Sequence, residues 1–298
     1  MALEVELKLT IHDAEHRPTQ ADLLACWQPL LAVTPTIDAP KSLLNAYFET
    51  PDQWFRRHDS GLRTRLKAGR YEQTIKLAGQ QQGAAHIRPE YNVPCDSVWP
   101  VLANFPAEIW PAGTQVSELQ AQLQEMFRTD FIREAYQLTL LDGSQVEAVL
   151  DSGAVLAGGA SSVICEIELE LVAGQSASLF ALARLLLARF DLSVGFQSKA
   201  ERGYRLAQHQ PLQWIEPDLS ATLGQWLRAI SQNLWLQQQA ASALQQQALL
   251  GLWQRFLLKL QQHSLPTELL AQAQQLDIGN HAACQRWLLD FTQWLLQE

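Results

Sequence analysis

Charged and apolar side chains alternate strictly in several short stretches of this sequence. Residues 4–8 read EVELK, residues 62–67 read LRTRLK and residues 166–170 read EIELE. Because successive side chains of a β-strand point to opposite faces, each stretch would carry all of its charges on one face. A single strand of this kind usually has a solvated polar face. The recurrence of the pattern with both signs of charge instead suggests one shared, charged site.

The residue types in these stretches suit a metal–polyphosphate complex. Guanidinium and ammonium groups bind successive phosphates, and arginine can do so with two parallel hydrogen bonds. Carboxylates two residues apart on neighbouring strands are typical oxygen ligands of Mg²⁺ or Mn²⁺. Phosphoryl transfer needs mainly positioning and neutralisation of charge. The candidate acids are Glu4, Glu6, Glu147, Asp151, Glu166, Glu168 and Glu170, and the candidate bases are Lys8, Arg63, Arg65, Lys76, Arg133, Lys199 and Arg202.

The elements that must position these charges are predicted to be about eight antiparallel strands. Turns such as the one at 142–143 separate them, and few segments could serve as parallel crossovers, which favours a closed barrel. Amphipathic helices near 19–33 and 176–190 would cover the apolar strand faces on the outside. The charged faces would then line the interior, where each ion costs several kcal/mol unless it is paired, hydrated or ligand-bound. For any single strand, an outward face with cross-strand ion pairs is the alternative.

A short amphipathic helix is predicted between the two halves of this barrel, at residues 117–127. Its apolar side chains recur at helical spacing: Leu119, Leu123, Met126 and Phe127. The next strand is predicted from Thr129 to Leu140 and carries Arg133.

Helical periodicity dominates the last quarter of the sequence. After a linker at 208–218, which contains Pro211 and Pro217, the chain is rich in Leu, Ala, Gln and Trp and lacks strand alternation. An all-α bundle is predicted, with helices near 220–238, 240–262, 266–276 and 280–297. We therefore expect an α+β protein, with a barrel domain at 1–207 and a small helical domain at 219–298.

Composition narrows the class of protein and of partner. The chain has 298 residues, of which 47% are hydrophobic, and a formal net charge of −9. These values fit a globular protein and argue against a nucleic-acid or anionic-membrane surface. The four cysteines show neither C-x-x-C spacing nor a companion histidine cluster, so no zinc site or disulfide framework is expected. With no signal-like start and no apolar run near the roughly 18 residues that span a bilayer, we expect a cytoplasmic protein with small-molecule partners.

Five motifs resemble, in order and spacing, those of the CYTH, or triphosphate tunnel metalloenzyme, superfamily. They are EVELK at 4–8, YFETPD at 47–52, LRTR at 62–65, CEIELE at 165–170 and SKAERGY at 198–204. The superfamily patterns that they match are E-x-E-x-K, Y-[YF]-D-T-P-D, L-R-x-R, a late E-x-E and S-K-x-x-R-G-Y. Glu49 stands where Asp is commoner. The resemblance covers residues 1–207.

The resemblance implies an eight-stranded tunnel that binds triphosphate through bases and divalent metal through acids. The phosphate-binding positions are occupied by Lys8, Arg63, Arg65, Lys76, Arg133, Lys199 and Arg202. The metal-binding positions are occupied by Glu4, Glu6, Asp151, Glu166, Glu168 and Glu170, with Glu90 and Glu147 as weaker candidates. The expected catalytic residues are Lys8, Glu6 and Glu168. One Mg²⁺ or Mn²⁺ would orient the triphosphate, and a second would activate water against the terminal phosphorus.

A tunnel followed by helices also resembles the bacterial inorganic triphosphatases that carry a CHAD domain, a helical bundle whose histidines bind phosphate. Residues 219–298 are few for such a domain, and their histidines are His263 and His281 alone. We therefore expect this region to pack against the barrel, or against a second copy of the chain in a homodimer, and not to bind polyphosphate.

The leading functional hypothesis is hydrolysis of inorganic tripolyphosphate to pyrophosphate and phosphate. Thiamine triphosphatase and class IV adenylate cyclase are alternatives on the same fold, and they differ in what lies at the tunnel entrance. A non-catalytic phosphate or polyphosphate sensor is an alternative of a different class. All of these readings require charged side chains that converge inside one barrel.

Overall fold

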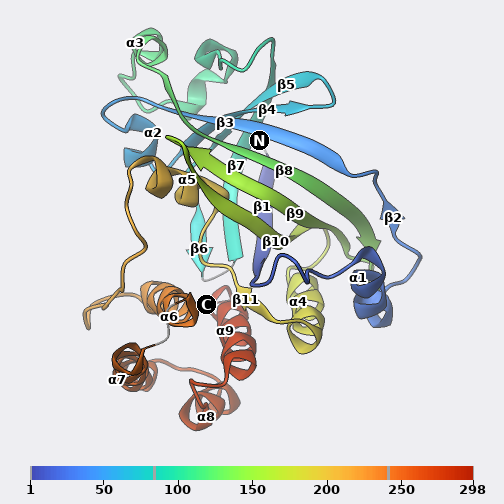
Figure 1. Ribbon diagram of the computed structural model, residues 1–298, viewed down its shortest axis with the longest axis vertical. Helices are drawn as coiled ribbons and strands as arrows, with labels where there is room; N and C mark the ends of the chain where they lie inside the picture. The colour runs from blue at the N-terminus through green and yellow to red at the C-terminus, as the bar shows by residue number, and fades with distance from the viewer. Residues whose placement is uncertain (1, 83–84, 240–241, 298) are drawn as a thin grey trace.

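Eight antiparallel strands close into a barrel in the computed structural model, which describes residues 2–82, 85–239 and 242–297 (Figure 1). Strand β1 pairs with β10 on one side and with β7 on the other, which completes the ring. In order around the ring, the strands are β1 (Ala2–Ile11), β10 (Ala160–Ala173), β9 (Gln145–Ala157), β8 (Gln124–Thr139), β3 (Lys41–Glu49), β4 (Gly61–Lys67), β5 (Arg70–Lys76) and β7 (Ala85–Cys95). The predicted α+β fold class with a closed barrel is confirmed.

Short elements extend the barrel and connect its strands. Strand β2 (Thr36–Ile37) pairs with β8, β6 (Gln80–Gln82) with β7, and β11 (Leu192–Val194) with β1. The short helices in the connections are α2 (Trp54–Arg57), α3 (Val116–Ala121) and the 3₁₀ turns Gln28–Leu30, Leu102–Asn104 and Ala107–Ile109.

The apolar faces of the strands point outward and are covered by helices, as the alternation predicted. Leu7 and Leu9 of β1 and Ile167 and Leu169 of β10 are fully buried in the main apolar core. Helix α4 (Ala177–Arg189) packs on both strands, and α1 (Gln20–Trp27) packs on α4. With the apolar faces used in this way, the opposite faces must point into the barrel.

The helix predicted at 117–127 is wrong in its second half. Helix α3 ends at Ala121 and β8 already begins at Gln124, so Met126 and Phe127 belong to the strand. Phe127 pairs with Tyr47 of β3, and their rings stack with centroids 4.4 Å apart. Sequence periodicity reports only the local helical spacing. The pairing of Phe127 with a strand that is distant in sequence outweighs that spacing.

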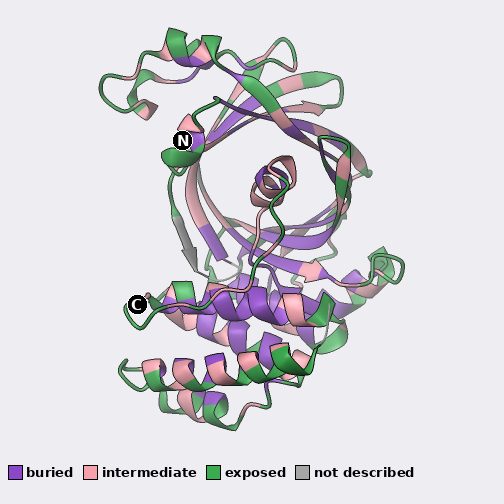
Figure 2. Ribbon diagram, turned by 60° about the vertical axis from the view of Figure 1, so that its left-hand side comes forward, coloured by how far each residue is buried: buried purple, intermediate pink, exposed green. Residues whose placement is uncertain are grey.

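One end of the barrel interior is apolar and holds α5 (Lys199–Ala207), which lies within the ring of strands seen end on (Figure 2). The hydroxyl of Ser198 caps this helix by accepting a hydrogen bond from the backbone N–H of Glu201. Tyr204 packs there with inward-facing apolar side chains of β3, β8, β9 and β10. The interior is therefore divided between an apolar end and a charged region.

In the described part of the chain, four helices follow residues 208–218; the first and the last contact β6 and β11, and the middle two pack on these helices. They are α6 (Leu223–Gln239), α7 (Ala243–Leu260), α8 (Thr267–Gln275) and α9 (His281–Leu295), close to the predicted ranges. Residues 240–241, predicted as the start of the second helix, lie outside the described residues. Helix α9 packs on α4, and the tryptophan-rich interior of these helices is continuous with the main core under β1 and β10. The division into two domains stays a prediction.

No helix in the described part of the chain has both the length and the hydropathy of a membrane span.

Replacing Gly203 of α5 with alanine should destabilise the protein. An added Cβ would lie 2.0 Å from Cε2 of Phe127, and overpacking of this kind typically costs about 1–3 kcal/mol. Gly251 in α7 is a matched control, because nothing lies within 4 Å of an added Cβ there. Gly251→Ala should therefore stabilise the helix by about 1 kcal/mol. Urea unfolding measures both changes, and a Gly203→Ala variant as stable as the wild type would contradict this packing.

Candidate active site in the barrel interior

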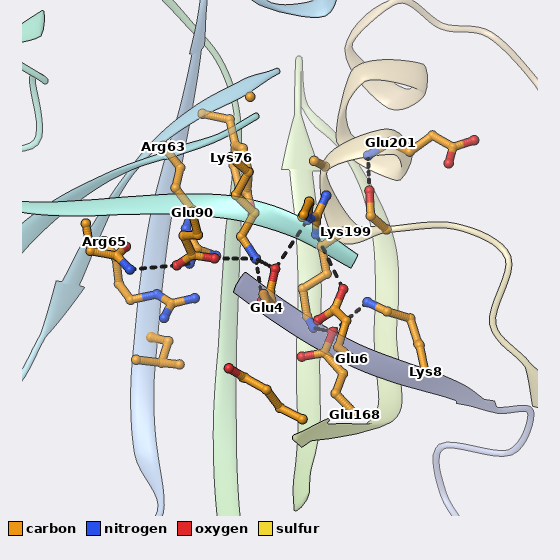
Figure 3. A pocket seen from close by; sticks show the side chains of 18 of the residues that line it. Glu4, Glu6, Lys8, Arg63, Arg65, Lys76, Glu90, Glu168, Lys199 and Glu201 are labelled. Carbon is orange, nitrogen blue, oxygen red and sulfur yellow. Dashed lines mark hydrogen bonds and ion pairs between the residues drawn. The ribbon is translucent and has the colours of Figure 1, made fainter. Parts of the chain in front are cut away.

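The charged faces of the strands surround a cavity of about 520 Å³ (Figure 3). On β1, Glu6 and Lys8 point inward and are only 6% and 2% exposed. Most of the predicted site residues line this cavity: Glu4, Glu6, Lys8, Arg63, Arg65, Lys76, Glu90, Arg133, Glu147, Glu168, Glu170 and Lys199. The other three, Asp151, Glu166 and Arg202, lie behind the lining and are joined to it by ion pairs.

Two lysines from different elements bind one group of buried carboxylates. Lys8 Nζ of β1 lies 2.5 Å from Glu168 Oε1 and 3.2 Å from Glu166 Oε1. Lys199 Nζ of α5 lies 2.5 Å from Glu166, 2.7 Å from Asp151 and 3.0 Å from Glu168. Burial alone would lower the pKa of each lysine, but the carboxylates outweigh it and raise the pKa above its usual value. Both lysines therefore remain ammonium ions at neutral pH.

Two arginines complete this group. Arg133 donates to both carboxylate oxygens of Asp151, at 2.8 and 2.6 Å, and to Glu168 at 2.8 Å. Arg202 Nη2 lies 2.5 Å from Glu166 Oε2. Although burial alone would raise the pKa of Glu166, Lys199, Lys8 and Arg202 lower it to about 2. Glu166 and Glu168, whose pKa the cations likewise lower, are therefore ionised, and each acid of the group is shared among cations.

A second group of ion pairs joins β1, β5 and β7. Lys76 Nζ lies 2.7 Å from Glu4 and 2.8 Å from Glu90. Arg88 extends the group, with its guanidinium 3.3 Å from Glu4 and 3.4 Å from Glu6. Arg88 was not among the site residues predicted from the sequence. Its position two residues before Glu90, on the same strand face, was the signal that could have found it.

Arg65 differs from the other buried bases of the cavity, because no carboxylate of the described residues lies within ion-pair distance of it. Its Nε donates to Asn45 Oδ1 at 2.7 Å. Arg63 and Arg133 repel its charge, and Glu90 attracts it more weakly from beyond ion-pair distance. Burial, followed by repulsion from these two arginines, lowers the pKa of Arg65 to about 9. Arg63 and Arg65 also lower the pKa of the Tyr47 phenol, although burial alone would raise it. A bound anion would relieve the repulsion among these arginines, so the side of the cavity that they line is best suited to phosphate.

Three acids face one another across β1, β10 and β9. Glu6 is opposite Glu170, and Glu170 is opposite Glu147. Burial raises the pKa of Glu170, and repulsion from Glu4, Glu147 and Glu6 brings it to about 7. Carboxylates that repel one another in this way are stabilised by a cation placed between them.

The carboxylates fit a hard divalent cation. Oxygens of Asp151, Glu166 and Glu168 lie within 4.8 Å of one another, although lysine and arginine already bond to them. Glu6 and Glu170 face the cavity directly. Donor sets that consist only of carboxylate oxygens suit Mg²⁺ or Mn²⁺ better than softer metals. Which of these acids would bind a metal stays a prediction.

Two arginine-to-methionine substitutions should affect the ligand-free protein differently. Arg65→Met removes a cation that repels its neighbours, so the free energy of unfolding should stay equal or rise. Arg133→Met removes the bidentate partner of Asp151, whose side chain is fully buried, and should cost about 3 kcal/mol. Denaturant unfolding without metal or phosphate measures both. Equal losses for the two variants would show that Arg65 is as well compensated as Arg133.

The raised pKa of Glu170 predicts a pH dependence of stability in chelator-treated protein. Folded Glu170 binds its proton more tightly than the unfolded side chain, whose pKa is near 4.5. Its contribution to stability is therefore present below that value and is lost as pH rises through about 7. The stability of the wild type relative to Glu170→Gln should decrease over this interval, and Mg²⁺ should reduce the difference. Identical pH profiles for the two proteins would contradict the prediction.

Comparison with known proteins agrees with this geometry. The family model described as the CYTH domain matches residues 2–204. The inorganic triphosphatase of Haemophilus influenzae is 33% identical over 177 residues, which are 57% of this chain and 48% of that protein. The chain thus spans about half the length of this curated relative.

Solved structures to which the chain is similar include the Hippeastrum protein HpAC1, which is described as having a dominant triphosphatase activity. It is 15% identical, with a TM-score of 0.45 over 70% of this chain and 97% of that one. The PH1819 protein of Pyrococcus horikoshii is 18% identical, with a TM-score of 0.40 over 70% and 99% of the two chains. The family model itself covers the whole barrel together with most of α5, and on that match the chain belongs to the CYTH domain family.

Proposed function

We propose that this protein hydrolyses inorganic tripolyphosphate to pyrophosphate and phosphate with the help of a divalent metal ion. The observation that carries the proposal is the cavity inside the barrel, where acids and bases interleave and the Arg65 guanidinium has no carboxylate partner among the described residues. The inorganic triphosphatase from Haemophilus influenzae is a relative over the matched region and supports the same substrate class.

The ion pairs of the free protein suggest how such a ligand would enter at low electrostatic cost. In the described part of the chain, each buried base that lines the cavity, except Arg65, pairs with an acid. Phosphate alone would therefore leave carboxylates buried and unpaired. A metal–polyphosphate complex brings both signs of charge. Its phosphates could take over the bases while its metal takes over the acids, so that no buried ion loses all its partners. This exchange explains why acids and bases share one cavity.

The phosphate chain would be held by the bases that line the cavity. Arg63 and Arg65 of β4 can offer planar donors to one phosphate, and Arg133 of β8 lies beside them. The remaining bases are ammonium groups and one peripheral guanidinium, which can neutralise further phosphate oxygens: Lys8, Lys76, Lys199 and Arg202. Lys8 keeps its proton, so we assign it to charge stabilisation and not to proton abstraction.

Glu4, Glu6, Glu168 and Glu170 face the cavity and would hold Mg²⁺ or Mn²⁺, with Asp151 and Glu166 behind them. The metal, when bound, supplies neutralisation of phosphate charge and a water of lowered pKa. The protein's own groups then fix the chain of phosphates, and α5 and the barrel wall limit access of bulk water. Glu6 and Glu168 are assigned to catalysis because both face the cavity beside Lys8: Glu6 lies two residues before it on β1, and Glu168 forms an ion pair with it.

The helical region would support this site from outside. Arg228 of α6 forms an ion pair with Glu201 of α5, and its guanidinium lies 5.6 Å from the ring centroid of Phe196. Helix α5 also carries Lys199. We therefore propose that the C-terminal helices hold α5 in position and do not bind polyphosphate themselves.

The proposal is tested by phosphate release from tripolyphosphate with Mg²⁺ or Mn²⁺. Lys8→Ala and Glu6→Ala should each lower the rate by on the order of 100-fold or more, because each removes a charge that acts in a water-poor site. Arg128→Ala is the matched control, since Arg128 pairs with Glu125 at a partly exposed position and is not part of the cavity lining. No release by the wild type, or equal rates in all variants, would reject the proposal.

The same preparation distinguishes the alternative functions. Tripolyphosphate, thiamine triphosphate and ATP are compared at equal concentration, and we expect the highest turnover with tripolyphosphate. A preference for thiamine triphosphate, or cyclisation of ATP, would assign the cavity to those reactions. Metal-dependent binding in a calorimeter without turnover of any of the three would identify a phosphate sensor.

A further inference from the structure

A group of possible metal ligands lies outside the charged cavity, where the barrel meets the C-terminal helices. His12 directly follows β1, Asp191 directly precedes β11, and His281 is the first residue of α9. One ligand atom from each of these three side chains lies within 4.8 Å of the other two. The three segments are held together by β1–β11 pairing and by a hydrogen bond from the backbone N–H of Val194 to Gln285 of α9.

His12 continues the alternation of β1 beyond Lys8 and Thr10. Thr10 is opposite Ser193 and Ile11 is opposite Leu192, so the next step of the same register places His12 opposite Asp191. His12 Nε2 lies 2.7 Å from Ser193 Oγ, and its ring meets the His281 ring edge to face with centroids 5.2 Å apart. Neighbouring strands and the start of a helix thus present two imidazoles to one point.

His281 directs one ring nitrogen at three oxygen atoms. Its Nε2 lies 3.2 Å from the Leu192 carbonyl oxygen, 3.4 Å from Ser193 Oγ and 3.7 Å from Asp191 Oδ1. Its Nδ1 lies 2.6 Å from the Gln238 side-chain amide. A carbonyl and a carboxylate only accept hydrogen bonds, and a single N–H can serve only one of them well. A cation among these atoms would satisfy them together once the ring proton moves to Nδ1 and the Gln238 amide turns its oxygen toward it.

We propose that His12, Asp191 and His281 form a binding site for Zn²⁺ or a similar divalent transition metal, with Ser193 Oγ or a water as a further ligand. Two imidazoles and a carboxylate are typical of Zn²⁺, whereas the all-oxygen cavity suits Mg²⁺ or Mn²⁺. Tetrahedral ligation places ligand atoms roughly 3.4 Å apart. Small side-chain rotations would bring the three groups to that separation, and the exposed Asp191 leaves an approach from solvent.

A metal here would tie the end of β1 and the start of β11 to the first turn of α9, and so would fasten the helical region to the barrel.

Cobalt substitution tests the site with a readout independent of catalysis. Full-length, chelator-treated protein is titrated with Co²⁺ in excess Mg²⁺, which occupies the cavity. We expect one equivalent to give the intense visible bands of four-coordinate Co²⁺, and Zn²⁺ to displace it and raise the Tm. His12→Gln and His281→Gln should lose the bands and weaken Zn²⁺ binding by about tenfold or more. His263→Gln, in the exposed turn after α7, is the matched control and should bind as the wild type does.

Two further variants keep the test decisive. Asp191 is largely exposed, so Asp191→Asn should fold normally and still weaken Zn²⁺ binding, even if a histidine variant misfolds. Glu168→Gln alters the cavity and should leave the cobalt bands intact. Zn²⁺ affinity unchanged in Asp191→Asn and His281→Gln, or bands that disappear in Glu168→Gln, would overturn the proposal.

Discussion

The constraint on which this structure depends is the closure of an amphipathic sheet. Once β1 pairs with both β10 and β7, every strand has one face inside and one face outside. The outer faces carry the larger apolar surface, because α1, α4 and the C-terminal helices cover them. The charged faces are thereby forced into a space where an unpaired ion costs several kcal/mol. Asp151, Glu166 and Glu168 are therefore each shared between two or more bases.

This arrangement stabilises the fold only weakly, because buried ion pairs seldom repay the cost of their desolvation. What it provides is a cavity whose charges can change partners. The pairing of charges is incomplete at two places. Arg65 has excess positive charge, and the row of Glu6, Glu170 and Glu147 has excess negative charge. These two places lie on the lining of the same cavity. Incomplete pairing of opposite sign at two sites is what a ligand with phosphate and metal parts would complete.

Strand periodicity was sufficient to predict which residues of β1, β4 and β10 share a face, and their convergence follows once the sheet closes. It could not predict partners, because the strands that face each other are far apart in sequence. Arg88 shares a strand face with Glu90, which the sequence shows, but only the register of β7 against β1 places it beside Glu4 and Glu6. That Arg65 would lack a carboxylate partner could not be predicted either, since this depends on which side chains the folded barrel places around it, Arg133 among them. The end of α3 was predicted wrongly because Phe127 lies in β8, where it pairs with Tyr47 of β3.

The cluster of His12 and His281 shows the same limit. Neither histidine belongs to a local motif, and the sequence analysis therefore expected no zinc site. Only the docking of α9 against β11 brings the two rings together. Strand periodicity also cannot separate the apolar end of the barrel interior from the charged region, because the same strand contributes Phe131 to one and Arg133 to the other.

The most direct measurement of the central claim is a crystal structure of the protein with tripolyphosphate and Mn²⁺, with the metal located by anomalous scattering. We predict a phosphate chain within the barrel, one phosphate against Arg65, and an Mn²⁺ peak among the carboxylates that face the cavity. Tripolyphosphate bound outside the barrel, or a barrel that keeps all its ion pairs while the ligand is bound elsewhere, would contradict it.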